Sequence, residues 1–308
     1  MRPRATQGGR GVLTGVPAGA PPLRLRGREL AGPVVMAVVN RTPDSFYAAA
    51  RYDEDGAREA VARAADEGAA IVDLGGVRAG RGPEVSVADE VARIVPLVAH
   101  VRAAHPDLLV SVDTWRAEVA AAAADEGADL VNDTWAGHDE RLVAVAAQRG
   151  LGVVVSHTGG AAPRTDPFRV QYGEGLDGVL DDVVATLTAG AARAVGLGID
   201  PASVLLDPTH DFGKNTWHSL HLLRRTEALV ALGHPVLMAL SRKDFVGETL
   251  GLPVDERLEG TLAATAVAAW LGARVFRAHD VAATRRVLEM VASVRGERAP
   301  AVAVRGLA

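Results

Sequence analysis

The sequence predicts an α/β protein with one architecture, a TIM (β/α)8 barrel preceded by an N-terminal β-hairpin. Eight short runs rich in Val, Ile and Leu alternate with eight longer segments in which apolar residues recur at helical spacing. Eight such units within 308 residues close into a barrel more readily than they form an open sheet. An open doubly wound sheet is the alternative, but no G-x-G-x-x-G motif follows the first strand.

Each predicted strand is a short apolar run, and each predicted helix is a longer run rich in Ala, Val and Leu. The strands are expected at Val34–Val39, Ala69–Leu74, Leu108–Val112, Asp129–Val131, Leu151–Ser156, Ser203–Leu206, Pro235–Leu240 and Ala273–Arg277. The helices are expected at Glu54–Gly68, Val87–Ala104, Arg116–Gly127, Asp139–Gly150, Glu174–Gly198, Thr216–Gly233, Asp255–Gly272 and Val281–Val294.

Glycines mark several of the expected boundaries. Five of the helices end in a glycine just before the next strand, which is the position where a left-handed residue stops a helix: Gly68, Gly127, Gly150, Gly233 and Gly272. Gly27, between L-R-L-R and R-E-L, indicates a short hairpin at the N-terminal end of the barrel. We therefore expect a flexible extension over residues 1–24, a barrel over 25–295 and a loose tail over 296–308.

Composition and charge exclude several classes of protein. Hydrophobic residues make up 48% of the chain, so a large core is possible. The net charge is −5 and no basic run is present, which argues against nucleic acid as a partner. No apolar stretch approaches the roughly 20 residues of a membrane span, and the first 30 residues lack the apolar region of a secretory signal. Without cysteine there are no disulfides or thiolate sites, and we expect a soluble cytoplasmic protein.

Two residue types are unusually rare in this chain. It contains two lysines, Lys214 and Lys243, against 31 arginines, and three asparagines, Asn40, Asn132 and Asn215. Lysines that persist under such a bias mark places where a compact ammonium is needed. All five residues fall in polar runs that follow the predicted strands, and in a barrel the chemistry lies at the C-terminal strand ends. The site is predicted there.

Three of these strand ends carry groups that suit a planar heterocycle. Asp113, Asn132 and Asp207 offer two carboxylates and an amide from three different strands. Such a set can bind the edge of an aminopyrimidinone, which presents several N–H donors. The alternative for each residue is that it caps the helix that follows, as Asp113 can for the segment beginning at Arg116.

A second group of strand-end residues suits an anion. Arg277 and His279, together with the acceptor oxygen of Asn40, suggest a site for an anionic di-oxygen group and a hard cation such as Mg²⁺. Lys243 can bridge the ring and the anion, and Phe212 can form a wall. No cluster shows zinc spacing, and nothing fixes a serine–histidine–acid set.

The motifs resemble those of the dihydropteroate synthase family. N-R-T-P-D-S-F, S-V-D-T, N-D, D-P-x-x-x-F-G-K, S-R-K and R-x-H-D occur here in the family's order, from about Val34 to Met290. The resemblance implies a TIM barrel that displaces pyrophosphate from 6-hydroxymethyl-7,8-dihydropterin pyrophosphate with the amine of p-aminobenzoate, assisted by Mg²⁺. A homodimer formed through the last helices is also implied, and the small, apolar segment Gly260–Trp270 suits close helix packing.

The resemblance also implies a role for each strand-end residue. The pterin is expected to contact Asp113, Asn132, Asp207 and Lys243, of which Asp113, Asp207 and Lys243 are the expected catalytic residues. Pyrophosphate is expected to contact Asn40, Arg277 and His279, with Asn40 also a ligand of the metal. Ser241 and Phe212 are expected to line the aryl-amine site. Binding would then act by orientation and charge neutralisation, without a protein nucleophile.

Two loops depart from the family pattern. The family's second loop reads close to D-I-G-G-E-S-T-R-P-G, whereas this chain continues after Gly76 with V-R-A-G, and neither Arg78 nor Arg81 is in register with the family arginine. The first loop has Tyr47-Ala48-Ala49-Ala50 in place of S-D-G-G, and the sixth has Thr209-His210-Asp211 in place of G-I-G. The residues expected to complete the aryl-amine site are thus rewritten, while those expected to hold pterin and pyrophosphate remain.

Four stretches, N-R-T-P-D-S-F-Y, D-T-W, H-T-G-G and D-F-G-K-N, are most similar to the second, synthase-like paralogue of actinobacteria, a subgroup generally regarded as lacking synthase activity. We therefore expect a protein that binds the pterin pyrophosphate with impaired or altered catalysis. The alternatives are an active synthase with an unusual second loop, and a pterin-dependent methyltransferase, against which the S-R-K and F-G-K runs argue.

Overall fold

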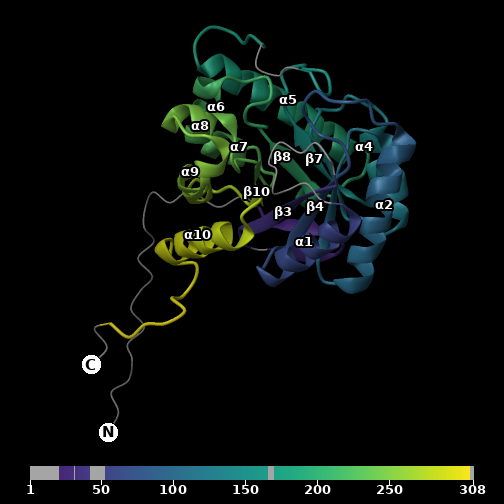
Figure 1. Ribbon diagram of the computed structural model, residues 1–308. Coiled ribbons are helices and arrows are strands. Elements are labelled where there is room, and N and C mark those ends of the chain that lie inside the picture. Colours follow the sequence, from purple (N-terminus) through teal and green to yellow (C-terminus); the bar gives the residue numbers. More distant parts are fainter. Residues whose placement is uncertain (1–20, 31, 42–52, 166–169, 306–308) are drawn as a thin grey trace.

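The computed structural model describes residues 21–30, 32–41, 53–165 and 170–305, and its centre is one parallel sheet of eight strands (Figure 1). The strand order is β8-β7-β6-β5-β4-β3-β10-β9. A bridge between Leu206 and Val236 joins β8 to the segment just before β9, which brings the two edges together. The predicted barrel is confirmed. Its strands are β3 (Val34–Asn40), β4 (Ile71–Gly75), β5 (Leu109–Asp113), β6 (Leu130–Asp133), β7 (Gly152–Ser156), β8 (Val204–Asp207), β9 (Leu237–Met238) and β10 (Val275–Ala278).

Helices surround these strands, as Figure 1 shows. They are α1 (Glu54–Asp66), α2 (Val87–Ala104), α3 (Ala117–Asp125), α4 (Leu142–Gln148), α5 (Asp177–Gly196), α6 (Thr216–Arg224), α7 (Thr226–Val230), α8 (Asp244–Leu250), α9 (Leu258–Trp270) and α10 (Val281–Val294), with 3-10 turns at Pro201–Ser203 and Val254–Glu256. The five glycines expected to end helices all have positive φ, between 69° and 103°. None of the described helices is long and apolar enough to cross a membrane.

Three elements differ from the prediction. The helix expected over Thr216–Gly233 is broken at Arg225 into α6 and α7, and the hydroxyl of Thr226 donates to the carbonyl of Leu223 at the break. β9 has two residues instead of the expected six, Pro235–Leu240. Helix α8 lies in a segment for which no helix was predicted, although Gly251, which ends it at φ 68°, followed by Pro253 is a recognisable stop signal.

The hairpin closes the N-terminal end of the barrel, as expected from Gly27. Strand β1 (Leu23–Leu25) pairs antiparallel with β2 (Arg28–Leu30), and the turn residues Arg26 and Gly27 have φ of 50° and 70°. Leu23 and Leu25 are buried against one apolar side chain from each barrel strand: Met36, Ile71, Leu109, Leu130, Val154, Leu205, Leu237 and Val275. Of the expected extension over residues 1–24, residues 1–20 lie outside the described residues, and residues 296–305 contain neither helix nor strand.

This apolar layer places the polar layer above it. Side chains two residues further along a strand point to the same face, so the next inward layer follows from the first. Two positions beyond the apolar layer stand Val38, Asp73, Ser111, Asn132, Ser156, Asp207, Ala239 and Arg277. A further two positions bring Asn40, Asp113, Ser241 and His279 to the rim at the C-terminal strand ends. The inward-facing side chains are thus apolar near the N-terminal end of the barrel and mostly polar near its C-terminal end.

Candidate functional site

All nine residues predicted to form the site line one cavity of about 350 Å³ at the C-terminal end of the barrel. Its wall includes Asn40, Asp113, Asn132, Asp207, Phe212, Ser241, Lys243, Arg277 and His279, together with residues 77–80 of the second loop. The structure therefore brings together residues spread over 240 positions of sequence, from 40 to 279. Their individual roles remain predictions.

Arg277 lies at the centre of the polar contacts in this cavity. Its Nε donates to Oδ2 of Asp73 at 2.5 Å, and its Nη2 donates to Oδ2 of Asp113 at 2.8 Å. The other oxygen of Asp113 accepts from the hydroxyl of Thr134 at 2.9 Å. Burial raises the pKa of Asp113 to about 7, and the charge of Arg277 opposes that rise. In the free protein, a residue expected to bind pyrophosphate is thus ion-paired with one expected to bind pterin.

Asp73, to which the sequence analysis assigned no role, joins three of these strands. The residue is fully buried, and its carboxylate accepts from Ser111 Oγ at 2.6 Å and Asn132 Nδ2 at 3.0 Å as well as from Arg277. Its position at the end of a strand, before Gly75 and Gly76, was a signal that could have identified it. A side chain at the Gly75 position would displace the amide of Asn40, since a Cβ there would lie 2.5 Å from Oδ1 of Asn40.

Asp207 and Lys243 face the same cavity from β8 and the loop after β9. Oδ1 of Asp207 accepts from the backbone N–H of Thr209 at 2.7 Å, and burial raises the pKa of this carboxyl. Nζ of Lys243 donates to the carbonyl of His210 at 3.0 Å, while burial lowers the pKa of this ammonium. Nζ also lies 4.4 Å from the ring centroid of Phe212, a cation–π distance. The pair provides a carboxyl and an ammonium near one aromatic wall.

Ser241 and His279 are held together at the rim. Ser241 Oγ lies 2.9 Å from Nδ1 of His279, and the backbone N–H of His279 also donates to this oxygen at 3.3 Å. Burial lowers the pKa of His279 to about 4. At neutral pH the imidazole is therefore neutral, so it can donate a hydrogen bond to an anion without contributing a positive charge.

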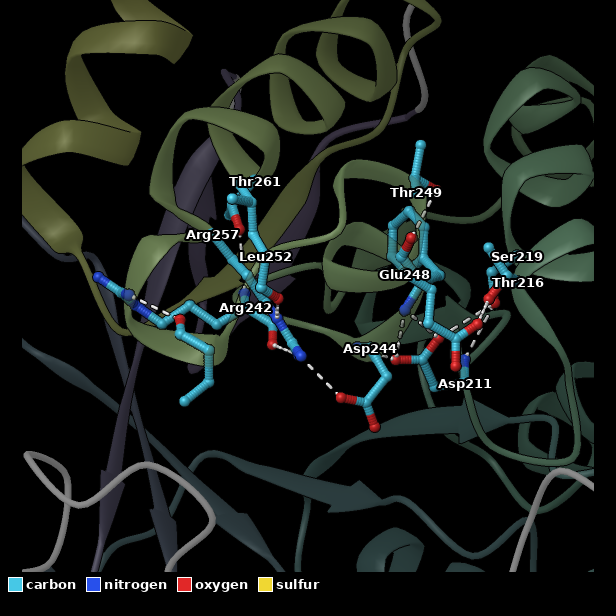
Figure 2. A network of polar contacts seen from close by, with 12 residues as sticks. Asp211, Thr216, Ser219, Arg242, Asp244, Glu248, Thr249, Leu252, Arg257 and Thr261 are labelled. Atoms are coloured by element: carbon cyan, nitrogen blue, oxygen red, sulfur yellow. Dashed lines mark hydrogen bonds and ion pairs between the residues drawn. The ribbon is translucent and has the colours of Figure 1, made fainter.

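Polar contacts join helix α8, which follows Lys243, to neighbouring segments, and Figure 2 shows part of this network. Asp211 accepts from the backbone N–H of Asp244 at 2.6 Å at the start of this helix, and Arg257 donates to the carboxylate of Asp244 at 2.8 Å. Arg242, buried with φ 54°, donates to Asp280 and to the carbonyls of residues 254 and 255. The carboxylate of Asp211, an addition to the sixth loop, thus accepts from the first backbone amides of α8. This contact was not predicted from the sequence.

Lys214 lies behind the same loop and is almost fully buried. Its Nζ donates to the carbonyls of His157 at 2.8 Å, Thr209 at 3.2 Å and Phe212 at 2.8 Å. Burial lowers the pKa of Lys214 to about 7, but three acceptors are satisfied only by the three N–H groups of an ammonium. We therefore assign the charged form. The rarity of lysine marked this residue in the sequence, although not its role.

Four residues of the second loop contribute to the cavity wall. Val77, Arg78, Ala79 and Gly80 line it, whereas Arg81 is exposed and does not. Arg164 holds the loop from the far side by donating to the carbonyls of Gly80 at 3.3 Å and Pro83 at 2.7 Å. The rewritten stretch of the first loop, residues 47–50, lies outside the described residues.

A magnesium ion fits this site only together with the oxygens of a bound anion. Among the described residues, no group of three or more His, Asp or Glu side chains could hold a metal. Asn40 offers one amide oxygen at the rim. Mg²⁺ commonly keeps several waters and takes its remaining ligands from one or two protein groups and substrate phosphates, which agrees with so small a protein contribution.

Comparison with known proteins decides the family. Residues 36–279 match the model of the family described as pterin binding enzyme, which is most of the chain. The chain belongs to the pterin-binding enzyme family. It is 60% identical over 276 residues to the Inactive dihydropteroate synthase 2 of Mycobacterium leprae, a match that covers 89% of this chain and 95% of that protein.

Solved structures of dihydropteroate synthases share the fold. The enzyme of Yersinia pestis, in a complex with a sulfonamide drug, superposes with a TM-score of 0.82 at 32% identity, covering 90% of this chain and all of that one. The enzyme of Thermus thermophilus in complex with 6HMPPP superposes with a TM-score of 0.75 at 37% identity, covering 89% and 100% of the two chains. This chain is therefore a dihydropteroate synthase-type member of the pterin-binding enzyme family.

Proposed function

We propose that this protein binds 6-hydroxymethyl-7,8-dihydropterin pyrophosphate in the 350 Å³ cavity, with impaired or altered transfer to p-aminobenzoate. The observation that carries the proposal is the composition of the cavity. The residues expected to hold pterin and pyrophosphate all line it, while the second-loop part of its wall is Val77-Arg78-Ala79-Gly80. The ligand in the similar Thermus thermophilus structure, 6HMPPP, supports the same class of ligand.

The cavity would act on this ligand through orientation and charge. Asp113, Asn132 and Asp207 would accept N–H donors of the ring, and Lys243 would stand between ring and anion. Arg277, His279 and Asn40 would hold the pyrophosphate, where Mg²⁺ would neutralise further negative charge. Breaking the bond between the exocyclic carbon and the pyrophosphate oxygen leaves positive charge on the pterin, which the buried carboxylates would stabilise.

The amine half of the site carries the proposed defect. Ser241 and Phe212 would still line it, but the Glu, Ser, Thr and Pro of the family's second loop are replaced. An aryl carboxylate would thereby lose polar partners that orient it for attack. The relative of Mycobacterium leprae named inactive supports this proposal.

An active synthase is the second candidate. Two lost contacts at about 1–2 kcal/mol each would weaken binding of the amine by roughly 2–4 kcal/mol, which slows turnover without forbidding it. The retained residues around Arg277 and Asp113 favour an active synthase as much as they favour a protein that only binds the pterin pyrophosphate.

We further propose a cytoplasmic homodimer that associates through α9 and α10. Val267, Met290 and Val294 leave 46%, 65% and 55% of their surfaces exposed, although all three are apolar. Such side chains, grouped on two helices that pack together, suit an interface. Analytical ultracentrifugation of Met290→Glu against the native chain tests this assembly; equal sedimentation of both as monomers would contradict it.

The test of function is pyrophosphate release from the dihydropterin pyrophosphate with and without p-aminobenzoate, together with calorimetric binding of each ligand with Mg²⁺. We expect the pterin pyrophosphate to bind and p-aminobenzoate barely to bind. Asp207→Ala and Lys243→Ala should abolish pterin binding, whereas Asp181→Ala, on an exposed position of α5, should not. Amine-dependent release at an ordinary rate would establish the active synthase instead, and unchanged affinity of both cavity variants would overturn the assignment.

A further inference from the structure

Asp73 contacts two cavity residues that are expected to serve opposite ends of the ligand. Asn132 Nδ2 lies 3.0 Å from Oδ2 of Asp73, and Arg277 Nε lies 2.5 Å from the same oxygen. The third donor, Ser111 Oγ, lies 2.6 Å from Oδ1, is fully buried and does not line the cavity. Asp73 itself does not line the cavity either, so it can act on a ligand only through the residues that it holds.

The contact with Asp73 fixes which end of the Asn132 amide is available. A salt-bridged carboxylate only accepts hydrogen bonds, so the nitrogen of the amide must face Asp73. The oxygen, Oδ1, is then left over, and it is a buried atom with no hydrogen-bond partner among the described residues. Asn132 lines the cavity and is 2% exposed, so the cavity holds a buried acceptor for which none of the described residues supplies a donor.

The same carboxylate anchors the arm of Arg277. Because Nε is held by Asp73, the outer part of the guanidinium, which bonds Asp113 at 2.8 Å, stays at the mouth of the cavity. A guanidinium that is already held in place loses less conformational entropy when it binds an anion than one on an unrestrained arginine side chain.

We propose that Asp73 is a positioning residue that presents Asn132 as an acceptor to the pterin ring and Arg277 as a donor to the pyrophosphate. The inference rests on the proposed function and deepens it, because it names the residue that sets the donor and acceptor pattern of the cavity. Replacing the carboxylate with the apolar side chain of leucine, which has a similar shape, would remove the acceptor of both donors. The amide of Asn132 would then lose the contact that fixes which of its ends faces the ring.

The experiment measures calorimetric affinities of the full chain for two probes, 6-hydroxymethyl-7,8-dihydropterin and inorganic pyrophosphate with Mg²⁺. In Asp73→Leu we expect about tenfold or greater weakening for each probe, the lower end of the roughly 10–100-fold losses that follow when groups supporting metal ligands are removed. Ser111→Ala removes a contact of Asp73 that faces no ligand, and it should change both affinities by less than about threefold.

Two double-mutant cycles separate positioning from a general structural effect. Adding Asp73→Leu to Asn132→Ala should not weaken pterin binding further, and adding it to Arg277→Lys should weaken pyrophosphate binding little further, because each partner is already changed. Losses that simply multiply in both cycles, or an Asp73→Leu chain that binds both probes as the native chain does, would overturn the proposal.

A measurement on the unliganded native chain keeps the inference testable apart from the proposed function and apart from any folding defect of the variant. The chain has three asparagines, so ¹⁵N-asparagine labelling gives three side-chain amide signals, and Asn132→Ala assigns one of them. We expect the N–H₂ protons of Asn132 to exchange slowly with water because Asp73 holds them. Exchange as fast as that of the exposed Asn215 would refute the orientation, whereas failure of the native chain to bind either probe would refute the proposed function.

Discussion

The guanidinium of Arg277 is bonded to the carboxylate of Asp113, with 2.8 Å between Nη2 and Oδ2, although the two residues are expected to hold opposite ends of one ligand. The pair occupies an oxygen that a pterin ring would need. This ion pair therefore uses part of the hydrogen-bonding capacity of Asp113, and a ligand must compete with Arg277 for that oxygen.

The first prediction concerns this competition. An anion at the mouth of the cavity should draw Nη2 of Arg277 away from Asp113, so saturating pyrophosphate should tighten binding of 6-hydroxymethyl-7,8-dihydropterin by about fivefold or more, the usual lower range for coupled sites. Calorimetry in both orders of addition checks it, since the two ligands must change each other's affinity by the same factor. Equal pterin affinity with and without pyrophosphate would mean that the ion pair imposes no barrier.

The second prediction concerns Lys214. Lys214→Met removes the donor to the carbonyls of His157 and Phe212, while that of Thr209 keeps the backbone N–H of Phe212, so the free energy of unfolding should fall by about 2 kcal/mol or more. Lys214→Arg should also destabilise, because a planar guanidinium does not fit a pocket shaped for an ammonium. Urea denaturation measures both, with Arg224→Met on the exposed surface of α6 as control. A stable Lys214→Arg chain would show that charge alone is required.

The third prediction concerns His210, a fully buried residue with no hydrogen-bond partner for either ring nitrogen among the described residues. His210→Leu removes two unsatisfied polar atoms and keeps an apolar contact with Phe245, whose ring lies 5.5 Å away. The free energy of unfolding should rise by about 1–3 kcal/mol at pH 7.5.

The same variant should alter the response to acid. Burial lowers the pKa of His210 to about 3, from about 6.5 in an unfolded chain, so the unfolded state binds more protons between these values. The stability of the native chain should therefore fall as pH drops below about 6.5, and His210→Leu should reduce that fall. Denaturation at pH 7.5 and 5.5 tests this, with the partly exposed His234→Leu as control. If the His210→Leu chain is less stable than the native chain, the prediction is wrong, and the ring has a hydrogen-bond partner that stabilises it.

The fourth prediction concerns the second loop. Replacing residues 77–82, V-R-A-G-R-G, with the family's E-S-T-R-P-G should strengthen p-aminobenzoate binding by about 2–4 kcal/mol in the presence of pyrophosphate, since two polar contacts are restored. The matched control carries the same graft with Ala in place of its Thr and Arg. If the full graft binds the amine no better than this control, the defect lies elsewhere, with the first loop as the next candidate.

Much of this architecture could be predicted because it depends on local periodicity. α2 and α10 begin and end at the expected residues, since their apolar spacing lies within the helices themselves and the capping box of α2 is formed by the neighbouring Ser86 and Asp89. The hairpin at Gly27 follows from a turn that needs positive φ. In contrast, α8 was missed because Asp211, which accepts hydrogen bonds from its first amides, lies 33 residues from Asp244.

The candidate site divides in the same way. Asn40, Asp113, Asn132, Asp207 and Arg277 could be named from sequence because strand ends of a parallel barrel meet at one mouth, whatever the details of packing. Asp73 could not be given a role, since its partners come from β5, β6 and β10. The sequence by itself determined the barrel and the residues at its mouth, through hydrophobic period and glycine placement. Only the tertiary structure decided which of them bond to each other, because hydrogen bonds and ion pairs act over about 3 Å and depend on strands far apart in the chain.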